Sequence, residues 1–148
     1  MMLNEGDKPI AKQDIDQNAL RRVQILKHLP LAIAQFDGTG KVMEQNPESS
    51  SVFGGSHSVG PTFVERFVDA SVGRNLLESI LSTDDFCHLD AQLRTATGDA
   101  GWFAIKAGQR RDPVTGETVV IYSARDITET VQARLEADRM HLEKSEFL

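Results

Sequence analysis

Apolar residues recur at two different periods along the chain, and each period predicts one kind of element. Residues 13–29 carry apolar side chains at spacings of four, four and three, which places them on one stripe of a helix. Those apolar positions are Ile15, Ala19, Val23 and Leu26. Pro30 ends this predicted helix, because proline cannot continue it. Residues 1–12 are polar and are expected to form a disordered tail.

Short apolar runs between turn sequences predict five β-strands. Residues 31–37 and 41–46 flank the turn sequence DGTG and predict a β-hairpin. Residues 86–95 and 102–107 alternate between apolar and polar positions, which is typical of half-buried antiparallel strands. Residues 117–126 (ETVVIYSARD) are apolar on both faces, so we expect a central strand that is covered on both sides.

A helical block separates the first two predicted strands from the last three. Asn46 and Pro47 predict a helix start, since Asn accepts hydrogen bonds from free N–H groups and Pro fits the first helical position. Two further short helices, broken near Gly73, are indicated by apolar pairs four residues apart. Those pairs come from Phe63, Val64, Phe67, Val68, Leu76, Leu77, Ile80 and Leu81. The order predicts an α+β fold with one five-stranded antiparallel sheet and short helices on one face.

Residues 127–148 predict one long helix, because they contain no Gly or Pro and are rich in Glu, Arg, Ala and Leu. Val131, Leu135 and Leu142 fall at d, a and a of a heptad, and Asp138 occupies the intervening d position. Pairing with a second copy as a coiled coil would bury this seam, and Asp138 would weaken the seam while fixing its register. The alternative is an amphipathic helix that lies back on its own domain.

Composition limits the function classes. A chain of 148 residues with 40% hydrophobic and 26% charged residues has the size and balance of one globular domain. The net charge of −6 argues against a nucleic acid or an anionic membrane as the main partner. One cysteine excludes a disulfide framework. The sequence shows no signal peptide and no apolar run long enough to span a bilayer, so we expect a cytoplasmic protein.

The strand order resembles that of a PAS domain over roughly residues 23 to 130. LPLAIAQFDGTGKVMEQNPESSSVFG resembles the opening strand pair and Asn-Pro helix start of that family, and GWFAIKAGQRRDPVTGETVVIYSARDIT resembles its closing strands. Asp126-Ile127-Thr128 matches the family's Asp-Ile-Thr junction between the last strand and a signalling helix. Independently, Asp126 and Thr128 are residue types that favour helix starts, so they would fix the angle at which the helix leaves the sheet.

The end of the chain adds a second resemblance. LEKSEFL is similar to the lead-in to the dimerisation and phosphoacceptor helices of a bacterial sensor histidine kinase. This resemblance implies a cytoplasmic sensory and dimerisation module of a two-component phosphorelay, followed by kinase domains and served by a response regulator. The chain itself would then be no enzyme. An alternative is a ligand-sensing module of another effector such as a diguanylate cyclase, because a fold does not fix function. A stand-alone enzyme is disfavoured, since no catalytic constellation is visible.

We predict no cofactor and no metal. The four histidines are scattered and show no H-x-x-H or H-E-x-x-H spacing: His28, His57, His88 and His141. Haem-binding PAS domains supply a histidine from the helical block, whereas residues 62–83 contain none. Covalent flavin chemistry in the family uses a cysteine in an Asn-Cys-Arg-Phe-Leu motif, whereas Cys87 lies in DFCHLD. Haem and covalently bound flavin are therefore disfavoured.

PAS-like sheets hold small molecules between the sheet and the helical block, so a small-molecule ligand is conceivable for this chain. The residues expected to line such a pocket are largely apolar: Phe36, Phe63, Phe67, Phe103, Ile105 and Tyr122. We favour plain core packing for them, because the sequence reveals no convergent polar groups to orient a specific ligand.

Overall fold

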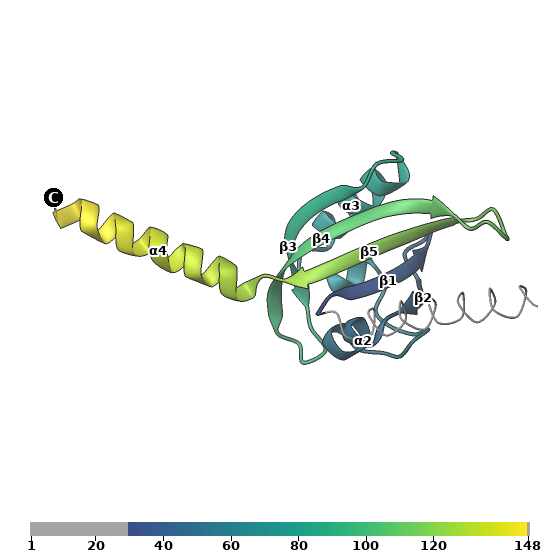
Figure 1. The fold of residues 1–148 in the computed structure, drawn as a ribbon, viewed down its shortest axis with the longest axis horizontal. Helices are drawn as coiled ribbons and strands as arrows, with labels where there is room; N and C mark the ends of the chain where they lie inside the picture. The colour runs from purple at the N-terminus through teal and green to yellow at the C-terminus, as the bar shows by residue number, and fades with distance from the viewer. Residues whose placement is uncertain (1–29, 148) are drawn as a thin grey trace, which may run out of the picture. The chain divides into compact units, whose positions relative to one another are not determined.

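The computed structural model describes residues 30–147, with side chains described for residues 30–142. Five antiparallel strands form one sheet in the order β2-β1-β5-β4-β3, so β5 lies at its centre (Figure 1). The strands are β1 (Ala32–Asp37), β2 (Val42–Gln45), β3 (Cys87–Arg94), β4 (Ala100–Arg111) and β5 (Thr118–Asp126). The helices are α2 (Pro47–Phe53), the 3-10 turn η1 (Val64–Arg66), α3 (Ala70–Leu81) and α4 (Thr128–Phe147).

This arrangement confirms the predicted α+β fold with a five-stranded antiparallel sheet and a central last strand. The helices α2 and α3 and the turn η1 lie against one face of the sheet (Figure 1). The predicted tail at residues 1–12 and the predicted helix at residues 13–29 lie outside the described residues.

Two polar side chains fix the first hairpin and the helix that follows it. Asp37 ends β1, and its Oδ1 accepts hydrogen bonds from Thr39 N at 2.9 Å and Lys41 N at 3.0 Å, which closes the turn. Asn46 Oδ1 accepts a hydrogen bond from Ser49 N at 2.9 Å and so caps α2, while a second bond from β1 reaches the same oxygen. The predicted Asn-Pro helix start is confirmed.

The helical segments between β2 and β3 differ from those expected. A single 3-10 turn, η1, stands where the first helix was predicted, and α3 runs through Gly73 without a break. A Cβ atom at Gly73 would lie 2.7 Å from Cδ1 of Phe67, so the glycine makes room for that ring. The predicted break at Gly73 is wrong because this glycine permits close packing inside the helix rather than ending it.

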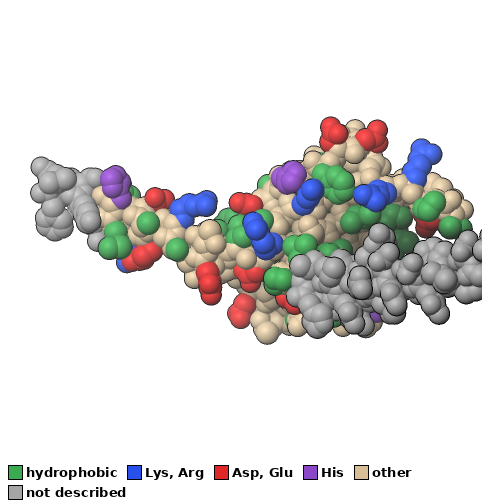
Figure 2. All heavy atoms as spheres, viewed as in Figure 1, with side chains coloured by type: hydrophobic (Ala, Val, Ile, Leu, Met, Phe, Trp, Pro, Cys, Tyr) green, Lys and Arg blue, Asp and Glu red, His purple; other side chains and the backbone are tan. Residues whose placement is uncertain are grey.

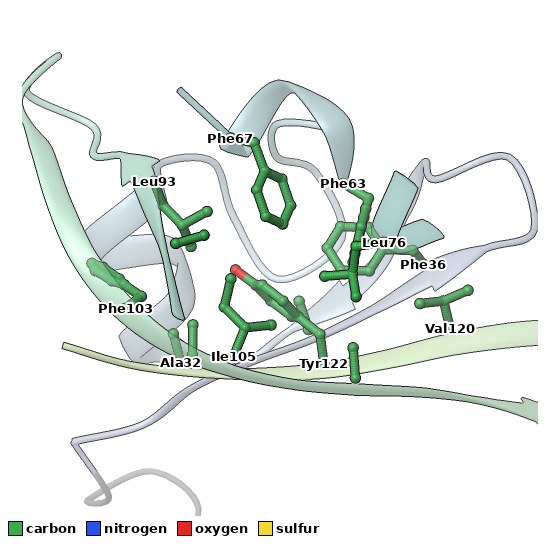
Figure 3. Close-up of a cluster of buried hydrophobic side chains, with 14 of the residues drawn as sticks. Ala32, Phe36, Phe63, Phe67, Leu76, Leu93, Phe103, Ile105, Val120 and Tyr122 are labelled. Atoms are coloured by element: carbon green, nitrogen blue, oxygen red, sulfur yellow. The ribbon is translucent and has the colours of Figure 1, made fainter. Parts of the chain in front are cut away.

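The hydrophobic core lies between the sheet and the helical segments (Figure 3). Alternate residues of β1, β4 and β5 are buried there, as the period of two in a strand requires. The sheet contributes Ala32, Ala34, Phe36, Val42, Ala91, Leu93, Phe103, Ile105, Ala107, Val120, Tyr122 and Ala124, and the helical side contributes Phe53, Phe63, Phe67, Leu76 and Ile80. On the opposite face of β5, Val119 is buried and Ile121 is half-buried.

Helix α4 follows β5 with a single residue between them (Figure 1). Val131 is half-buried, and every residue from 132 to 142 is exposed. Hydrophobic and charged side chains are interspersed along this helix (Figure 2). Within residues 30–147, no helix is both long and apolar enough to cross a membrane.

Candidate functional site

The residues predicted to line a pocket all lie in the core cluster, where they contact one another. The six, Phe36, Phe63, Phe67, Phe103, Ile105 and Tyr122, are buried. The ring of Phe36 meets that of Phe63 edge to face at a centroid distance of 5.3 Å, and that of Tyr122 at 5.2 Å. Edge-to-face contacts at this distance are favourable beyond the area they bury. The structure therefore places these side chains in a packed interior (Figure 3).

An arginine lies inside this apolar interior. Arg66, the last residue of η1, is only 1% exposed. Its Nη1 donates to Ser49 Oγ at 3.1 Å and to Tyr122 Oη at 2.8 Å, and its Nη2 donates to Gln45 Oε1 at 3.2 Å. Its Nε donates to Pro61 O at 3.1 Å. Among the described residues, these four acceptors are uncharged oxygen atoms and none of them is a carboxylate.

Three aromatic rings surround the same guanidinium group. Arg66 Cζ lies 5.0 Å from the ring centroid of Phe36, 5.1 Å from that of Phe53 and 5.4 Å from that of Tyr122. A cation this close to aromatic faces is attracted by about 2 kcal/mol or more per contact when water is excluded. We call these three rings, together with the side chains of Gln45 and Ser49 and the carbonyl of Pro61, the Arg66 cage.

Gln45 joins the cage to the loop that covers it. Its Oε1 accepts hydrogen bonds from Ser49 Oγ and from Arg66, while its Nε2 points the other way. Nε2 lies within 2.8 to 3.0 Å of three carbonyl oxygens of the loop after α2, those of Gly54, Ser56 and Val59. Gln45 is only 3% exposed. One buried amide therefore ties the surface loop to the guanidinium group.

The surroundings of Tyr122 in the cage shift the pKa of its phenol. Tyr122 is fully buried, and burial raises the pKa of its phenol because the charged form is poorly solvated there. The positive charge of Arg66 and its hydrogen bond oppose this rise in pKa without cancelling it. The phenol therefore stays neutral across the physiological range, and its oxygen accepts a hydrogen bond from Arg66.

We expect alkaline pH to destabilise the fold through Tyr122. The unfolded state loses the phenol proton near its ordinary pKa of about 10, whereas the folded state keeps it, so the free energy of unfolding falls as pH rises above that value. Tyr122 is the only tyrosine in the sequence, so tyrosinate absorbance reports on this residue alone. The absorbance should rise together with loss of the circular dichroism of the fold. Tyrosinate forming near pH 10 in the folded protein would contradict the expectation.

Four residues of the cage were not predicted as site residues from the sequence: Gln45, Ser49, Phe53 and Arg66. The sequence revealed no convergent polar groups that would orient a specific ligand, and that expectation stays a prediction. The structure shows a set of buried polar side chains bound to one another: Gln45, Ser49 and Arg66 are hydrogen-bonded together, and Arg66 also donates to the hydroxyl of Tyr122. One sequence signal was present: Glu65 and Arg66 together interrupt the apolar residues between Phe63 and Val68. A charged residue between apolar residues is equally compatible with a side chain that points to solvent. Only the fold shows that the side chain of Arg66 points into the core.

The junction residues connect the start of α4 to β4. Thr128 N donates a hydrogen bond to Asp126 Oδ1 at 2.9 Å, and Trp102 N donates to Thr128 Oγ1 at 3.0 Å. Ile127 N donates to Trp102 O at 2.8 Å. Both backbone groups of Trp102 thus hold the residues that lead into α4. The contact between Trp102 and Thr128 was not predicted, because the two residues lie 26 positions apart in the sequence.

The residues predicted for a dimer seam lie along α4. Leu135 is 61% exposed and Leu142 is 64% exposed, whereas Val131 is half-buried. Asp138 is exposed between them. Met140 adds a further exposed apolar side chain outside the predicted seam. Within the described part of the chain, no other element packs over Leu135 or Leu142.

The described histidine and cysteine side chains considered for metal or cofactor binding do not form a cluster. Within the described residues, no group of three His, Cys, Asp or Glu side chains is placed to hold a metal ion. His57 Nε2 lies 3.2 Å from Glu44 Oε1 at the surface, and His88 is exposed on β3. Cys87 is half-buried at the edge of the core. His28 lies outside the described residues.

Comparisons with known proteins place the fold. Neither the protein-family models nor the curated proteins compared with the sequence give a match. Among solved structures, the chain is similar to the PAS domain of an HTR-like protein from Haloarcula marismortui, with 17% identity, a TM-score of 0.63, and coverage of 80% of this chain and 99% of that one. These values establish that the chain has the fold of a PAS domain, as predicted.

Two further similar structures come from signalling proteins. One is the PAS domain of nitrogen regulation protein NR(II) from Vibrio parahaemolyticus, with 15% identity, a TM-score of 0.58, and coverage of 72% of this chain and 97% of that one. The other is a sensory box histidine kinase/response regulator from Burkholderia thailandensis E264, with 17% identity, a TM-score of 0.58, and coverage of 80% and 92%.

Proposed function

We propose that this chain is a cytoplasmic PAS sensory and dimerisation module of a bacterial two-component sensor histidine kinase. In this proposal the chain is not itself an enzyme and passes a conformational signal through α4 to kinase domains, which in turn act on a response regulator. The module works without haem and without covalently bound flavin. The observation that carries the proposal is the way in which β5 enters α4.

The junction couples the sheet to α4. Ile127 and Thr128 are hydrogen-bonded to both backbone groups of Trp102 on β4, so a change in the spacing of β4 and β5 alters the start of the helix. Beyond its first turn, α4 exposes Leu135 and Leu142, which pairing with a second copy would bury. The kinase assignment is further supported by the LEKSEFL ending and by the kinases among the similar structures.

We expect Leu135→Asp to weaken self-association of the 148-residue chain at least about tenfold, because an unpaired charge would enter the seam. Analytical ultracentrifugation over a range of concentrations measures the effect. Ala137→Asp is the matched control, since it adds the same charge at position c, outside the seam. Asp138→Leu should instead tighten the dimer by completing the d position.

A wild-type chain that stays monomeric at high concentration would overturn the dimer reading, as would equal association of the Leu135 and Ala137 variants. Loss of near-ultraviolet dichroism in Leu135→Asp would show that α4 packs on its own domain.

The alternative function is that of a PAS module of a diguanylate cyclase. The sequence of the parent gene decides between this alternative and the kinase. A His-Glu pair followed by Pro-Leu shortly after Leu148 supports the kinase, and a Gly-Gly-Asp-Glu-Phe run further on supports the cyclase.

A further inference from the structure

The interior of the domain contains a positive charge that no described acidic group neutralises. Arg66 is 1% exposed, and its four hydrogen-bond acceptors are a phenol, a hydroxyl, a side-chain amide and a backbone carbonyl. Lysine and arginine are almost never fully buried unless they are paired, because removing a cation from water is costly. The surroundings of Arg66 must therefore replace both water and a counter-ion.

The cage supplies this replacement through aromatic rings and neutral oxygen atoms. Arg66 Cζ lies over aromatic rings from β1, α2 and β5, with Cζ to centroid distances of 5.0 to 5.4 Å. Oxygen atoms of Gln45, Ser49 and Tyr122 accept its outer N–H groups, and the carbonyl of Pro61 accepts Nε–H. Aromatic rings close to the cation and oxygen acceptors for its N–H groups are the arrangement that recognises a guanidinium group.

We propose that the interior of this domain is a binding site for a guanidinium group, and that Arg66 occupies it as an intramolecular ligand. The class of free ligand that fits the site is an alkylguanidinium cation. This inference does not depend on the proposed kinase role, since it concerns the interior and not α4.

The loop after α2 closes the site over its occupant. Gln45 holds three carbonyls of this loop through Nε2 and Arg66 through Oε1. A Cβ atom at Gly60 would lie 2.8 Å from Gln45 Nε2 and 3.4 Å from Arg66 Nη2, so the backbone of the loop lies directly against the cage at this residue. The effective concentration of a tethered group is in the millimolar range or higher, so a free alkylguanidinium competes poorly while Arg66 is in place.

The first test compares Arg66→Lys with Arg66→Met. The two side chains have similar size, and only lysine carries a charge. In an ordinary apolar core a buried lysine is far less favourable than a buried methionine. In a cation site the order reverses, so the midpoint of urea unfolding at neutral pH should fall in the order wild type, Arg66→Lys, Arg66→Met. A methionine variant as stable as the lysine variant, or more stable, overturns the proposal.

The second test restores the missing cation from solution. Arg66→Ala removes the atoms that N-ethylguanidinium contains, and N-ethylurea has nearly the same shape without the charge. Thermal unfolding is followed with each compound at low concentration, and sodium chloride keeps the ionic strength equal. N-ethylguanidinium should stabilise Arg66→Ala in a saturable way, with an apparent Kd at least about tenfold lower than that of N-ethylurea. Wild type should not respond.

Each other outcome counts against the site. Equal responses of wild type and Arg66→Ala indicate a general solvent effect, and equal responses to the two compounds show that charge is not recognised. If Arg66→Ala is unfolded alone, folding that depends on N-ethylguanidinium supports the proposal, and no folding at any concentration overturns it. A negative result in these two tests does not bear on self-association through α4. It can therefore be distinguished from failure of the proposed function.

Discussion

Phe36→Ala is expected to lower the free energy of unfolding by about 4 kcal/mol, because it removes a fully buried ring and leaves a cavity. Phe36 contacts the rings of Phe63 and Tyr122 edge to face, and Arg66 Cζ lies 5.0 Å from its centroid. Truncation thus removes apolar burial, two ring contacts and one wall of the Arg66 cage together. Urea unfolding followed by circular dichroism measures the loss.

Phe86→Ala is the matched control for this change. Phe86 is 41% exposed, packs over Gly108, and lies beneath the ammonium group of Lys106 at 5.3 Å. The same truncation at a half-exposed position should cost only about 1 kcal/mol, because water fills the space and the lost cation–π contact is solvated. Similar losses in the two variants would show that the core around Phe36 relaxes and that the cage is not a rigid unit.

The fold was predictable because its elements are specified locally. Alternation in β3 and β4, apolar residues on both faces of β5, and the Asp37 and Asn46 turn and cap residues each act within a few positions in sequence. Gly73 shows the limit of such reasoning. Its role depends on the ring of Phe67, which the local pattern does not place against it.

The polar part of the candidate site was not predictable, because its contacts cross the chain. Arg66 binds Ser49 at a separation of 17 residues and Tyr122 at a separation of 56. Nothing in the local sequence distinguishes an arginine that points into the core from one that points to solvent. The apolar residues of the same site were predicted, since burial alone selects them, whereas their arrangement around a cation needed the structure.

The same limit applies at the junction. Asp126 and Thr128 were predicted from their capping chemistry, but their tie to Trp102 depends on the pairing of β4 with β5. Tyr122 lies on β5 as well, four residues before Asp126. One strand therefore carries both a wall of the Arg66 cage and the start of the junction.

Arg66→Met and Tyr122→Phe are expected to be strongly non-additive. Arg66→Met should lower the free energy of unfolding by about 3 kcal/mol, because it leaves the buried hydroxyl of Tyr122 and the carbonyl of Pro61 without their donor. Tyr122→Phe should cost about 2 kcal/mol, since Arg66 Nη1 then loses a charge-assisted hydrogen bond. The double variant lacks both the guanidinium group of Arg66 and the hydroxyl of Tyr122, so neither of them is left buried without its partner. The loss in free energy of unfolding should therefore be about 3 kcal/mol rather than the sum of the two single losses.

The coupling energy of about 2 kcal/mol is measured by a double-mutant cycle in urea, with the fluorescence of Trp102 as the probe. Trp102 is the only tryptophan in the sequence, so its signal also reports whether the junction unfolds with the core. The control cycle pairs Arg66→Met with Phe86→Ala, which should be additive to within about 0.5 kcal/mol because the two sites share no partner. Additivity in the Arg66–Tyr122 cycle would mean that the 2.8 Å hydrogen bond contributes nothing specific, and that Arg66 is held by the aromatic rings and by its other three hydrogen bonds.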